Sequence, residues 1–339
     1  MVHRPLAWER DGRDWPLREA SRFVSAGGLR WHVQTLGVQR PHVPVIWLLH
    51  GTGASTHSWR GLMPLLARDF RVAAVDLPGH GFSAMPQAGV ASPLFTLSGM
   101  AAALVALMHA IDMRPNMVIG HSAGAAVAAR MCLDQRVTPE LLVGINAALL
   151  PLDGLAGRVY APMARWMAAS ALVPRLFAWR AADPHMREKL IAATGSVLDP
   201  VGQALYGRLM QDAGHASAAL AMMANWDLCT LARDLPQLRT PMHLCVGEGD
   251  RTVAPTQAAQ VRGRLRPHPL TAVTSLGSLG HMAHEERPAL VAERVGKLWL
   301  RLAEHALVPA ALPAQTMKPV QPAPAHAPGV PTTRGVGAL

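Results

Sequence analysis

A serine flanked by glycines carries the clearest chemical pattern in the chain. The pentapeptide Gly120–Gly124 reads Gly-His-Ser-Ala-Gly and places Ser122 at its centre. It follows a short β-rich run, Asn116–Ile119, and opens a stretch of small residues typical of a helix. Glycines allow a strand to turn tightly into a helix, so that the serine oxygen projects at a helix N-terminus, where positive partial charge favours a developing anion. The alternative is a glycine-permitted turn with an incidental serine, but the strand–turn–helix context favours a nucleophile.

A serine hydroxyl is a poor nucleophile unless a base takes its proton and an acid orients that base. His281 follows the last predicted strand, and Asp250 lies just past the strand before it. Glu248 is a rival acid, but Asp250 is favoured because it lies farther into its loop. We therefore predict a catalytic triad in which Ser122 attacks, His281 transfers the proton and Asp250 orients His281. Asn146, which ends an earlier strand, cannot supply a carboxylate.

A second glycine-containing loop could stabilise an anion. His50–Gly53, which reads His-Gly-Thr-Gly, comes directly after the apolar run Val43–Leu49. Tetrahedral acyl intermediates need preorganised backbone donors, and we predict the amides of Thr52 and Ala123 as this oxyanion hole. A phosphate-binding loop is the competing interpretation. It fails because no Lys-Ser/Thr pair follows and the third spaced glycine is missing.

Several histidines near these motifs invite a metal interpretation. His281, His284 and Glu285–Glu286 lie close together. A helical zinc pair instead has histidines at i and i+4 with a glutamate between them, and a zinc site needs three or four converging ligands. We therefore expect no metal and no cofactor. His284 is expected to begin a helix or contact the catalytic residues, and His50 and His121 to orient their loops through local hydrogen bonds.

The elements that must position these residues alternate between strand and helix. The predicted strands are Arg22–Ser25, Leu29–Thr35, Val43–Leu49, Arg71–Leu77, Asn116–Gly120, Leu141–Asn146, Met242–Gly247 and Thr271–Leu276. The predicted helices are Trp59–Ala67, Leu97–Ile111, Ser122–Leu133, Thr256–Leu265 and Glu285–Glu304. This alternation predicts an α/β fold, with a mostly parallel eight-stranded sheet, helices on both faces and the leading hairpin as an antiparallel edge.

The strand pattern disappears between Ala147 and Asp227, where a helical pattern is punctuated by prolines. An insertion after the sixth strand would lie over the site as a lid, because catalytic loops gather at the carboxyl ends of parallel strands. We divide the chain into an N-terminal extension (1–20), a first core part (21–147), a helical cap (148–230), a second core part (231–305) and a Pro/Ala-rich tail (306–339). The tail is expected to be disordered.

The composition excludes several classes of protein. The 339 residues are 50% hydrophobic and 16% charged, which is enough apolar material for a substantial core. The net charge of +10 comes from scattered arginines, without the clustered basic stripe that nucleic-acid binding needs. Three cysteines cannot form a disulfide framework. No apolar run of about 18 residues and no signal peptide are visible, so we expect a cytoplasmic location without a spanning helix.

Five ordered motifs together resemble the α/β-hydrolase superfamily. They are His50–Gly53, Asp76–Ser83, Gly120–Gly124, Gly247–Asp250 and Gly280–His281. The resemblance implies the α/β-hydrolase fold with a Ser-His-Asp triad in the chain order Ser, Asp, His. It also implies that Asp76–Ser83 is a structural turn without chemistry. Relatives with epoxide-hydrolase or dehalogenase chemistry use a carboxylate where Ser122 stands, so those reactions are disfavoured.

Three further segments are similar to a narrower group, the BchO-type magnesium-chelatase accessory proteins of bacteriochlorophyll biosynthesis. They are Trp8–Pro16, Ala26–Gln34 and Leu49–Arg60. This resemblance implies a role near the insertion of magnesium into protoporphyrin IX, without establishing a reaction. It implies a hydrophobic small-molecule substrate, with a tetrapyrrole as a candidate, and a magnesium-chelatase subunit as a partner.

The predicted cap is rich in methionine, tryptophan and arginine. One interpretation is a pair of helices that packs on the core. The other is an adaptable apolar pocket or interfacial surface for a flat hydrophobic ligand, with rim arginines pairing with the propionates of a porphyrin. On the second interpretation the substrate-binding residues are Arg165, Trp166, Met167, Met222 and Met223.

Two functions from different classes therefore remain open. The first is serine-dependent acyl hydrolysis of an ester-like substrate. The second is a non-catalytic accessory that binds porphyrin or a chelatase subunit on a hydrolase scaffold, and a fold alone cannot decide between them. Peripheral contact with the inner, photosynthetic membrane through the cap and the basic surface is a weaker third hypothesis.

Overall fold

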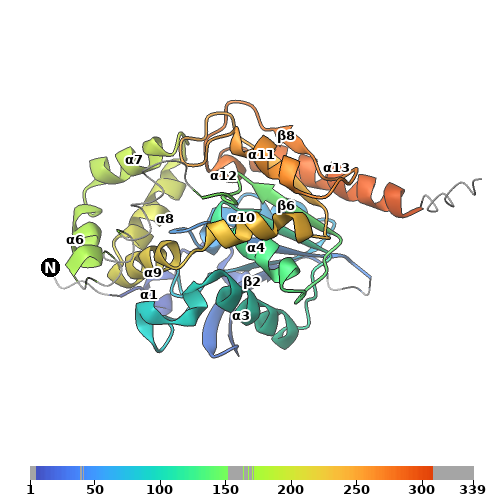
Figure 1. The fold of residues 1–339 in the computed structure, drawn as a ribbon. Coiled ribbons are helices and arrows are strands. Elements are labelled where there is room, and N and C mark those ends of the chain that lie inside the picture. Colours follow the sequence, from blue (N-terminus) through green and yellow to red (C-terminus); the bar gives the residue numbers. More distant parts are fainter. Residues whose placement is uncertain are drawn as a thin grey trace, which may run out of the picture.

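The computed structural model describes residues 5–38, 40, 42–151, 163, 167, 170 and 172–307 (Figure 1). Arg165, Trp166 and the predicted tail beyond residue 307 lie outside these described residues. In the described part, no helix combines the length and the apolar character needed to cross a membrane.

An eight-stranded sheet forms the centre of the fold, in the order β1-β2-β4-β3-β5-β6-β7-β8. The strands are β1 (Ser21–Ala26), β2 (Leu29–Leu36), β3 (Val45–Leu49), β4 (Arg71–Val75), β5 (Met117–His121), β6 (Leu141–Ile145), β7 (Met242–Val246) and β8 (Val273–Ser275). β2 pairs antiparallel with β1 and with β4, and the other neighbours pair parallel. The predicted α/β fold is confirmed, and the carboxyl ends of its parallel strands meet at one edge of the sheet.

Alternation of side chains along the buried strands builds a core on each face of the sheet. In β3, Trp47 and Leu49 join one core, while Ile46 and Leu48 join the other. The first core is covered by α3 (Leu97–Ala110), α4 (Ala123–Leu133), α10 (Leu228–Asp234) and α11 (Gln257–Arg264), and the second by α2 (Met63–Leu66), α12 (Ala283–Glu286) and α13 (Pro288–Leu307). Helices therefore cover both faces of the sheet, which explains why the parallel strands are almost continuously apolar.

Two predicted helices differ from the structure, and proline explains both differences. The helix predicted over Trp59–Ala67 is instead a 3-10 turn, η2 (Thr56–Trp59), followed by the short α2, because Pro64 is tolerated only in the first turn of a helix. The helix predicted over Glu285–Glu304 is divided into α12 and α13. Its break falls at Arg287, whose conformation is non-helical because Pro288 follows it.

Helices occupy the described part of the segment between β6 and β7, where no strand is found. They are α6 (Leu172–Arg180), α7 (Pro184–Ala193), α8 (Pro200–Met210) and α9 (Ala213–Ala224), followed by α10. Asp183, Asp199 and Asp212 precede α7, α8 and α9 and accept hydrogen bonds from the first-turn amides. Figure 1 shows α6–α9, hereafter the cap helices, grouped at one end of the molecule.

The N-terminal segment packs against the rest of the chain in its described part. It contains α1 (Trp8–Asp11) and η1 (Arg18–Ala20), and the remaining short 3-10 helices are η3 (Gly89–Ala91), η4 (Pro93–Phe95) and η5 (Leu235–Gln237). The rings of Trp8 and Trp15 each pack edge-on against Phe82, with centroids 4.9 Å away. Arg208 of α8 forms an ion pair with Asp14 at 2.7 Å. This segment therefore bridges the core and the cap helices.

Candidate active site

Ser122 lies in a sharp strand-to-helix turn between β5 and α4. Its backbone has φ 49° and ψ −113°, a conformation that L-residues rarely adopt and that costs about 1–3 kcal/mol. Both flanking glycines are required by close backbone approach. A Cβ at Gly120 would lie 2.3 Å from the Ala125 nitrogen, and one at Gly124 would lie 2.0 Å from the Leu49 oxygen. The sequence thus forms this strained turn because only glycine fits two positions before and two positions after the serine.

Asp250 and His281 form a direct hydrogen-bonded pair at the ends of β7 and β8. Nδ1 of His281 donates to Oδ2 of Asp250 over 2.8 Å. The other oxygen, Oδ1, accepts from the amides of Thr252 at 2.7 Å and Val253 at 2.9 Å, which fixes the carboxylate plane. Glu248, the rival acid, instead accepts a hydrogen bond from Ser275 at an exposed position. Asp250 is therefore the acid in contact with the histidine.

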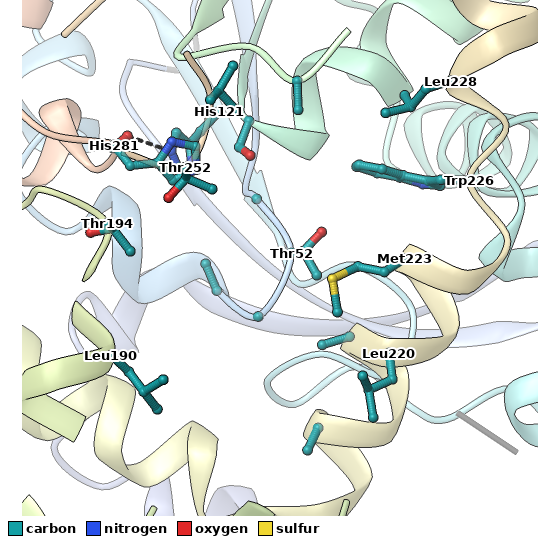
Figure 2. A pocket seen from close by; sticks show the side chains of 18 of the residues that line it. Thr52, His121, Leu190, Thr194, Leu220, Met223, Trp226, Leu228, Thr252 and His281 are labelled. Atoms are coloured by element: carbon teal, nitrogen blue, oxygen red, sulfur yellow. Dashed lines mark hydrogen bonds between the residues drawn. The ribbon is translucent and has the colours of Figure 1, made fainter. Parts of the chain in front are cut away.

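One large cavity brings the serine and the histidine together. Its volume is about 1010 Å³, and Ser122 and His281 both line it. Figure 2 shows His281 at its wall. In the described part of the chain, the Ser122 hydroxyl forms no hydrogen bond with another protein group. Nucleophile–base hydrogen bonds are often loose before a substrate binds and tighten in the reacting complex. The arrangement leaves the hydroxyl available at the wall of a cavity that His281 also lines.

The loop after β3 packs against the serine turn. A Cβ at Gly51 would lie 2.9 Å from Nδ1 of His121 and 3.1 Å from Cβ of Ser122, so glycine permits this contact. Within the residues that the structure describes, the amides of Thr52 and Ala123 donate to no protein acceptor. Both residues flank the serine turn, and Thr52 lines the cavity (Figure 2). These two N–H groups are free to stabilise an oxyanion.

His50 and His215 hold this loop through its backbone. His50 donates from Nδ1 to the Gly51 carbonyl at 2.7 Å and accepts at Nε2 from the Leu77 amide at 2.9 Å. His215, on cap helix α9, accepts from the Gly81 amide at Nδ1 and donates from Nε2 to the Gly53 carbonyl at 3.0 Å. Cap helix α9 therefore helps to set the position of the His50–Gly53 loop.

Asn146 connects the loops of Asp250 and His281, which the sequence did not reveal. Its Nδ2 donates to the carbonyls of Gly280 at 2.7 Å and His281 at 2.9 Å, and its Oδ1 accepts from the Gly247 amide at 2.8 Å. Its backbone lies at φ 46°, where asparagine is favoured over most residues. Without a carboxylate, Asn146 cannot be the acid of the triad. Its side-chain amide instead joins the loop that carries Asp250 to the loop that carries His281.

The connection between α7 and α8 supports the same two loops from the other side. The Thr194 carbonyl accepts from the amides of Arg251 and His281, both at 3.2 Å, and the Ser196 hydroxyl accepts from the Met282 amide at 2.8 Å. A Cβ at Gly195 would lie 2.0 Å from the Gly249 oxygen. No sequence motif marks this segment, because its role depends on contacts with residues far away in the chain.

A buried polar network lies behind His281. The His121 ring lies 4.7 Å from the His281 ring and 4.4 Å from the His284 ring, between centroids. Nε2 of His284 lies 2.6 Å from the Ser58 hydroxyl, which donates to Glu285 at 3.0 Å. Glu285 also accepts from Tyr206 of α8 at 2.8 Å and pairs with Arg60 at 2.7 Å. Burial raises the pKa of Glu285, and the Arg60 charge opposes that rise. The network connects the cap helices to the core next to the base.

Burial favours the neutral form of a group of histidines in the folded protein. Desolvation lowers the pKa of His50 to about 4 and that of His284 to about 3. Burial also lowers the pKa of five more buried histidines, namely His57, His80, His121, His215 and His243. In the unfolded chain these histidines take up protons near pH 6.5. In the folded protein they do so only at a lower pH, because burial has lowered their pKa values. Their contribution to stability is therefore complete above pH 6.5 and is lost as the pH falls toward 4.

We accordingly expect a steep loss of stability below pH 6.5. Each of these histidines opposes folding by up to roughly 1.4 kcal/mol per pH unit in this interval. Urea unfolding at pH 7.5, 6.5, 5.5 and 4.5 should show a midpoint that falls progressively, with uptake of more than one proton per molecule. His185→Gln, at an exposed position, is the control and should leave the slope unchanged. A midpoint that stays constant between pH 7.5 and 5 would contradict this expectation.

The predicted substrate-binding residues of the cap do not all line the cavity in the described part of the chain. Met167 and Met223 line the cavity, and Met223 is seen at its wall in Figure 2. Met222 lies in the core instead and places its sulfur 3.8 Å from the Thr52 hydroxyl. Arg165 and Trp166 lie outside the described residues. The remaining cavity wall is mostly apolar and includes Leu150, Val173, Phe177, Leu190, Ile191, Met210, Leu220, Trp226, Leu228 and Val253.

Comparison with known proteins gives a consistent result. Residues 48–294 match the model of the Alpha/beta hydrolase family. The magnesium-chelatase 30 kDa subunit of Rhodobacter capsulatus is 38% identical over 272 residues, which cover 80% of this chain and 92% of the relative. A pimeloyl-acyl-carrier-protein methyl ester esterase of Vibrio atlanticus is 26% identical over 256 residues, which cover 71% of this chain and 86% of the relative.

A solved structure shows the same architecture. The thermophilic esterase of Thermogutta terrifontis superposes with a TM-score of 0.64 at 20% identity, covering 83% of this chain and 98% of the esterase. At this identity the likeness shows the fold alone, because one fold supports many reactions.

Proposed function

Because the chain belongs to the alpha/beta hydrolase family, we propose that it is a serine esterase whose catalytic residues are Ser122, His281 and Asp250. The observation that carries the proposal is the 2.8 Å pair of His281 and Asp250, which opens onto the same cavity as the strained Ser122. A serine in a tight turn, beside a base that is itself oriented by a carboxylate, is the arrangement that activates a hydroxyl.

The proposed reaction proceeds in two halves. Ser122 Oγ attacks the ester carbonyl while Nε2 of His281 takes its proton, and the amides of Thr52 and Ala123 stabilise the oxyanion. The tetrahedral intermediate collapses, His281 gives the proton to the departing alcohol, and an acyl-serine remains. Water, deprotonated by His281, then attacks the acyl group and releases the acid with Ser122 restored. Asp250 stays ionised and stabilises the imidazolium formed in each half.

The cavity supports a bulky apolar ester as the substrate. Its volume of about 1010 Å³ exceeds what a short-chain ester needs, and its wall is dominated by aliphatic, aromatic and methionine side chains. In the part of the chain that the structure describes, no lysine or arginine lines it. An apolar group therefore fits the interior better than a charged one. The cap helices contribute much of this wall, and we propose that they act as the lid of the site.

A serine-reactive probe tests the proposal directly. A fluorophosphonate should label the folded protein once, and peptide mapping by mass spectrometry should place the label on Ser122. Heat-denatured protein and Ser122→Ala should remain unlabelled, while Ser217→Ala, a change on cap helix α9, should label as the unmodified chain does. Absence of labelling, or a label on another serine, would rule the proposal out.

The second candidate function is that of a magnesium-chelatase accessory. It rests on the relative from Rhodobacter capsulatus, which is named a subunit of that enzyme. On this proposal the chain binds a tetrapyrrole or a chelatase subunit. Ser122 is then retained from the hydrolase scaffold and catalyses no reaction. The discriminating experiment measures magnesium insertion by purified chelatase with and without this protein. Equal stimulation by the unmodified chain and by Ser122→Ala would favour the accessory role over the esterase.

A further inference from the structure

Helix α6 is apolar on both of its sides. On the inner side Val173 and Phe177 line the cavity, and Pro174 and Ala178 are buried. On the outer side Leu172, Leu176 and Trp179 are 73%, 57% and 67% exposed. These three residues, hereafter the outer stripe, are spaced by four and three positions and therefore lie along one face of the helix. Figure 1 shows α6 at the outer edge of the cap helices, away from the sheet.

The outer stripe forms a contiguous apolar patch on the surface of the cap helices. Single exposed apolar residues are normal, but contiguous patches of large ones mark interaction surfaces. The inner side already supplies the packing that holds α6 on the protein, since α6 contacts α9 and the cavity wall. The outer stripe is therefore not needed for folding, and polar residues there would leave the core intact.

The charges around the outer stripe indicate the kind of partner. Arg175 and Arg180 are exposed, and helical spacing places them on opposite sides of the stripe. From Leu172 to Ala182 the sequence contains no carboxylate, and the whole chain has a formal net charge of +10. A surface that is apolar in the middle and cationic along both borders matches a bilayer with anionic headgroups. Long arginine side chains can reach such headgroups, and tryptophan favours the same interfacial depth.

We propose that the outer stripe of α6, flanked by Arg175 and Arg180, seats the protein on the surface of an anionic lipid bilayer. The same helix forms the cavity wall through Val173 and Phe177, so the bilayer surface and the cavity are separated by one helix. An apolar ester dissolved in the bilayer then reaches Ser122 without crossing bulk water. This last step rests on the proposed esterase function, whereas the docking itself does not.

Vesicle flotation tests the docking. The full chain is mixed with vesicles of phosphatidylcholine alone or with 30% phosphatidylglycerol, and the floated fraction is measured. We expect binding to the anionic vesicles to fall at least tenfold in the combined variant Leu172→Ser, Leu176→Ser and Trp179→Ser. Leu300→Ser is the matched control, because Leu300 is 63% exposed but lies on α13, away from the cap helices. It should float as the unmodified chain does.

Two further measurements distinguish a lipid surface from a second copy of the chain. Arg175→Gln with Arg180→Gln should weaken flotation on anionic vesicles only, and added salt should do the same. Sedimentation without lipid reports self-association. If the outer stripe drives dimerisation in solution and the vesicles do not float the protein, the partner is a second copy and the proposal is wrong. Equal flotation of the triple variant and the unmodified chain would also overturn it.

Separate measurements test the docking proposal and the esterase proposal, so either can be contradicted without the other. Hydrolysis of a water-soluble short-chain ester should be equal in the triple variant and the unmodified chain, because the outer stripe does not line the cavity. Hydrolysis of an apolar ester embedded in anionic vesicles should fall with flotation. Flotation without any hydrolysis would support the docking proposal and contradict the esterase proposal. Hydrolysis without flotation would support the esterase proposal and contradict the docking proposal.

Discussion

Ser122→Ala is expected to lower kcat for ester hydrolysis by about 10⁵–10⁶-fold, the scale seen when the nucleophile of such a unit is removed. The substitution deletes the one atom that forms the acyl intermediate. It leaves the free amides of Thr52 and Ala123 and the cavity in place, so substrate binding should persist. The measurement is steady-state hydrolysis of a chromogenic ester, with KM changing far less than kcat.

Controls must show that the loss of activity in Ser122→Ala comes from the missing hydroxyl and not from a loss of folded protein. Ser275→Ala removes a hydroxyl that binds Glu248 at an exposed position, and it should hydrolyse the ester at the unmodified rate. Thermal unfolding should show that Ser122→Ala is at least as stable as the unmodified chain, because alanine has no hydroxyl to desolvate. Retention of more than a hundredth of the activity in Ser122→Ala would mean that another group is the nucleophile.

Asp250→Asn should lower kcat by roughly 10⁴-fold, although the substitution changes a single atom. The oxygen Oδ1 already accepts from the amides of Thr252 and Val253, so the asparagine oxygen will keep that position. Its NH₂ group then faces Nδ1 of His281 and donates to it. The imidazole proton is forced onto Nε2, where it blocks transfer from Ser122. The loss arises from the wrong tautomer and not from displacement of the ring.

Glu248→Gln is the matched control for Asp250→Asn. Glu248 lies two residues earlier in the same loop and contacts Ser275 instead of His281. Its substitution should change kcat less than twofold. If the two variants lost activity equally, or if only Glu248→Gln did, the acid would have been assigned to the wrong residue.

The sequence predicted the core architecture well because parallel strands buried on both faces have few alternatives. Ile46–Leu49 is apolar at every position, and β3 is buried throughout. The serine turn was equally visible, because Gly120 and Gly124 are required by backbone contacts that no other residue permits. Sequence position also favoured Asp250 over Glu248 as the partner of His281, since residues farther past a strand reach farther over the edge of the sheet. The structure pairs His281 with Asp250.

Other parts of the site could not be predicted, because their roles come from long-range contacts. Asn146 bonds groups more than a hundred residues away, and nothing in its neighbourhood distinguishes it from an ordinary strand end. Composition alone predicts Met222 in the pocket, but α9 turns it into the core while its neighbour Met223 faces the cavity. Only the rotation of the helix separates the two, and the mixture of small and apolar residues along α9 does not fix that rotation.

The bonds of Thr194 and Ser196 bear on how a substrate enters. If the cap lifted away at the α7–α8 end, Arg251, His281 and Met282 would all lose the partners of their amides, and the base would lose its alignment. We therefore expect that end to stay in place when a substrate enters, and an entrance to form instead where α6 borders the cavity. On this expectation a substrate would enter without breaking the hydrogen bonds that align His281.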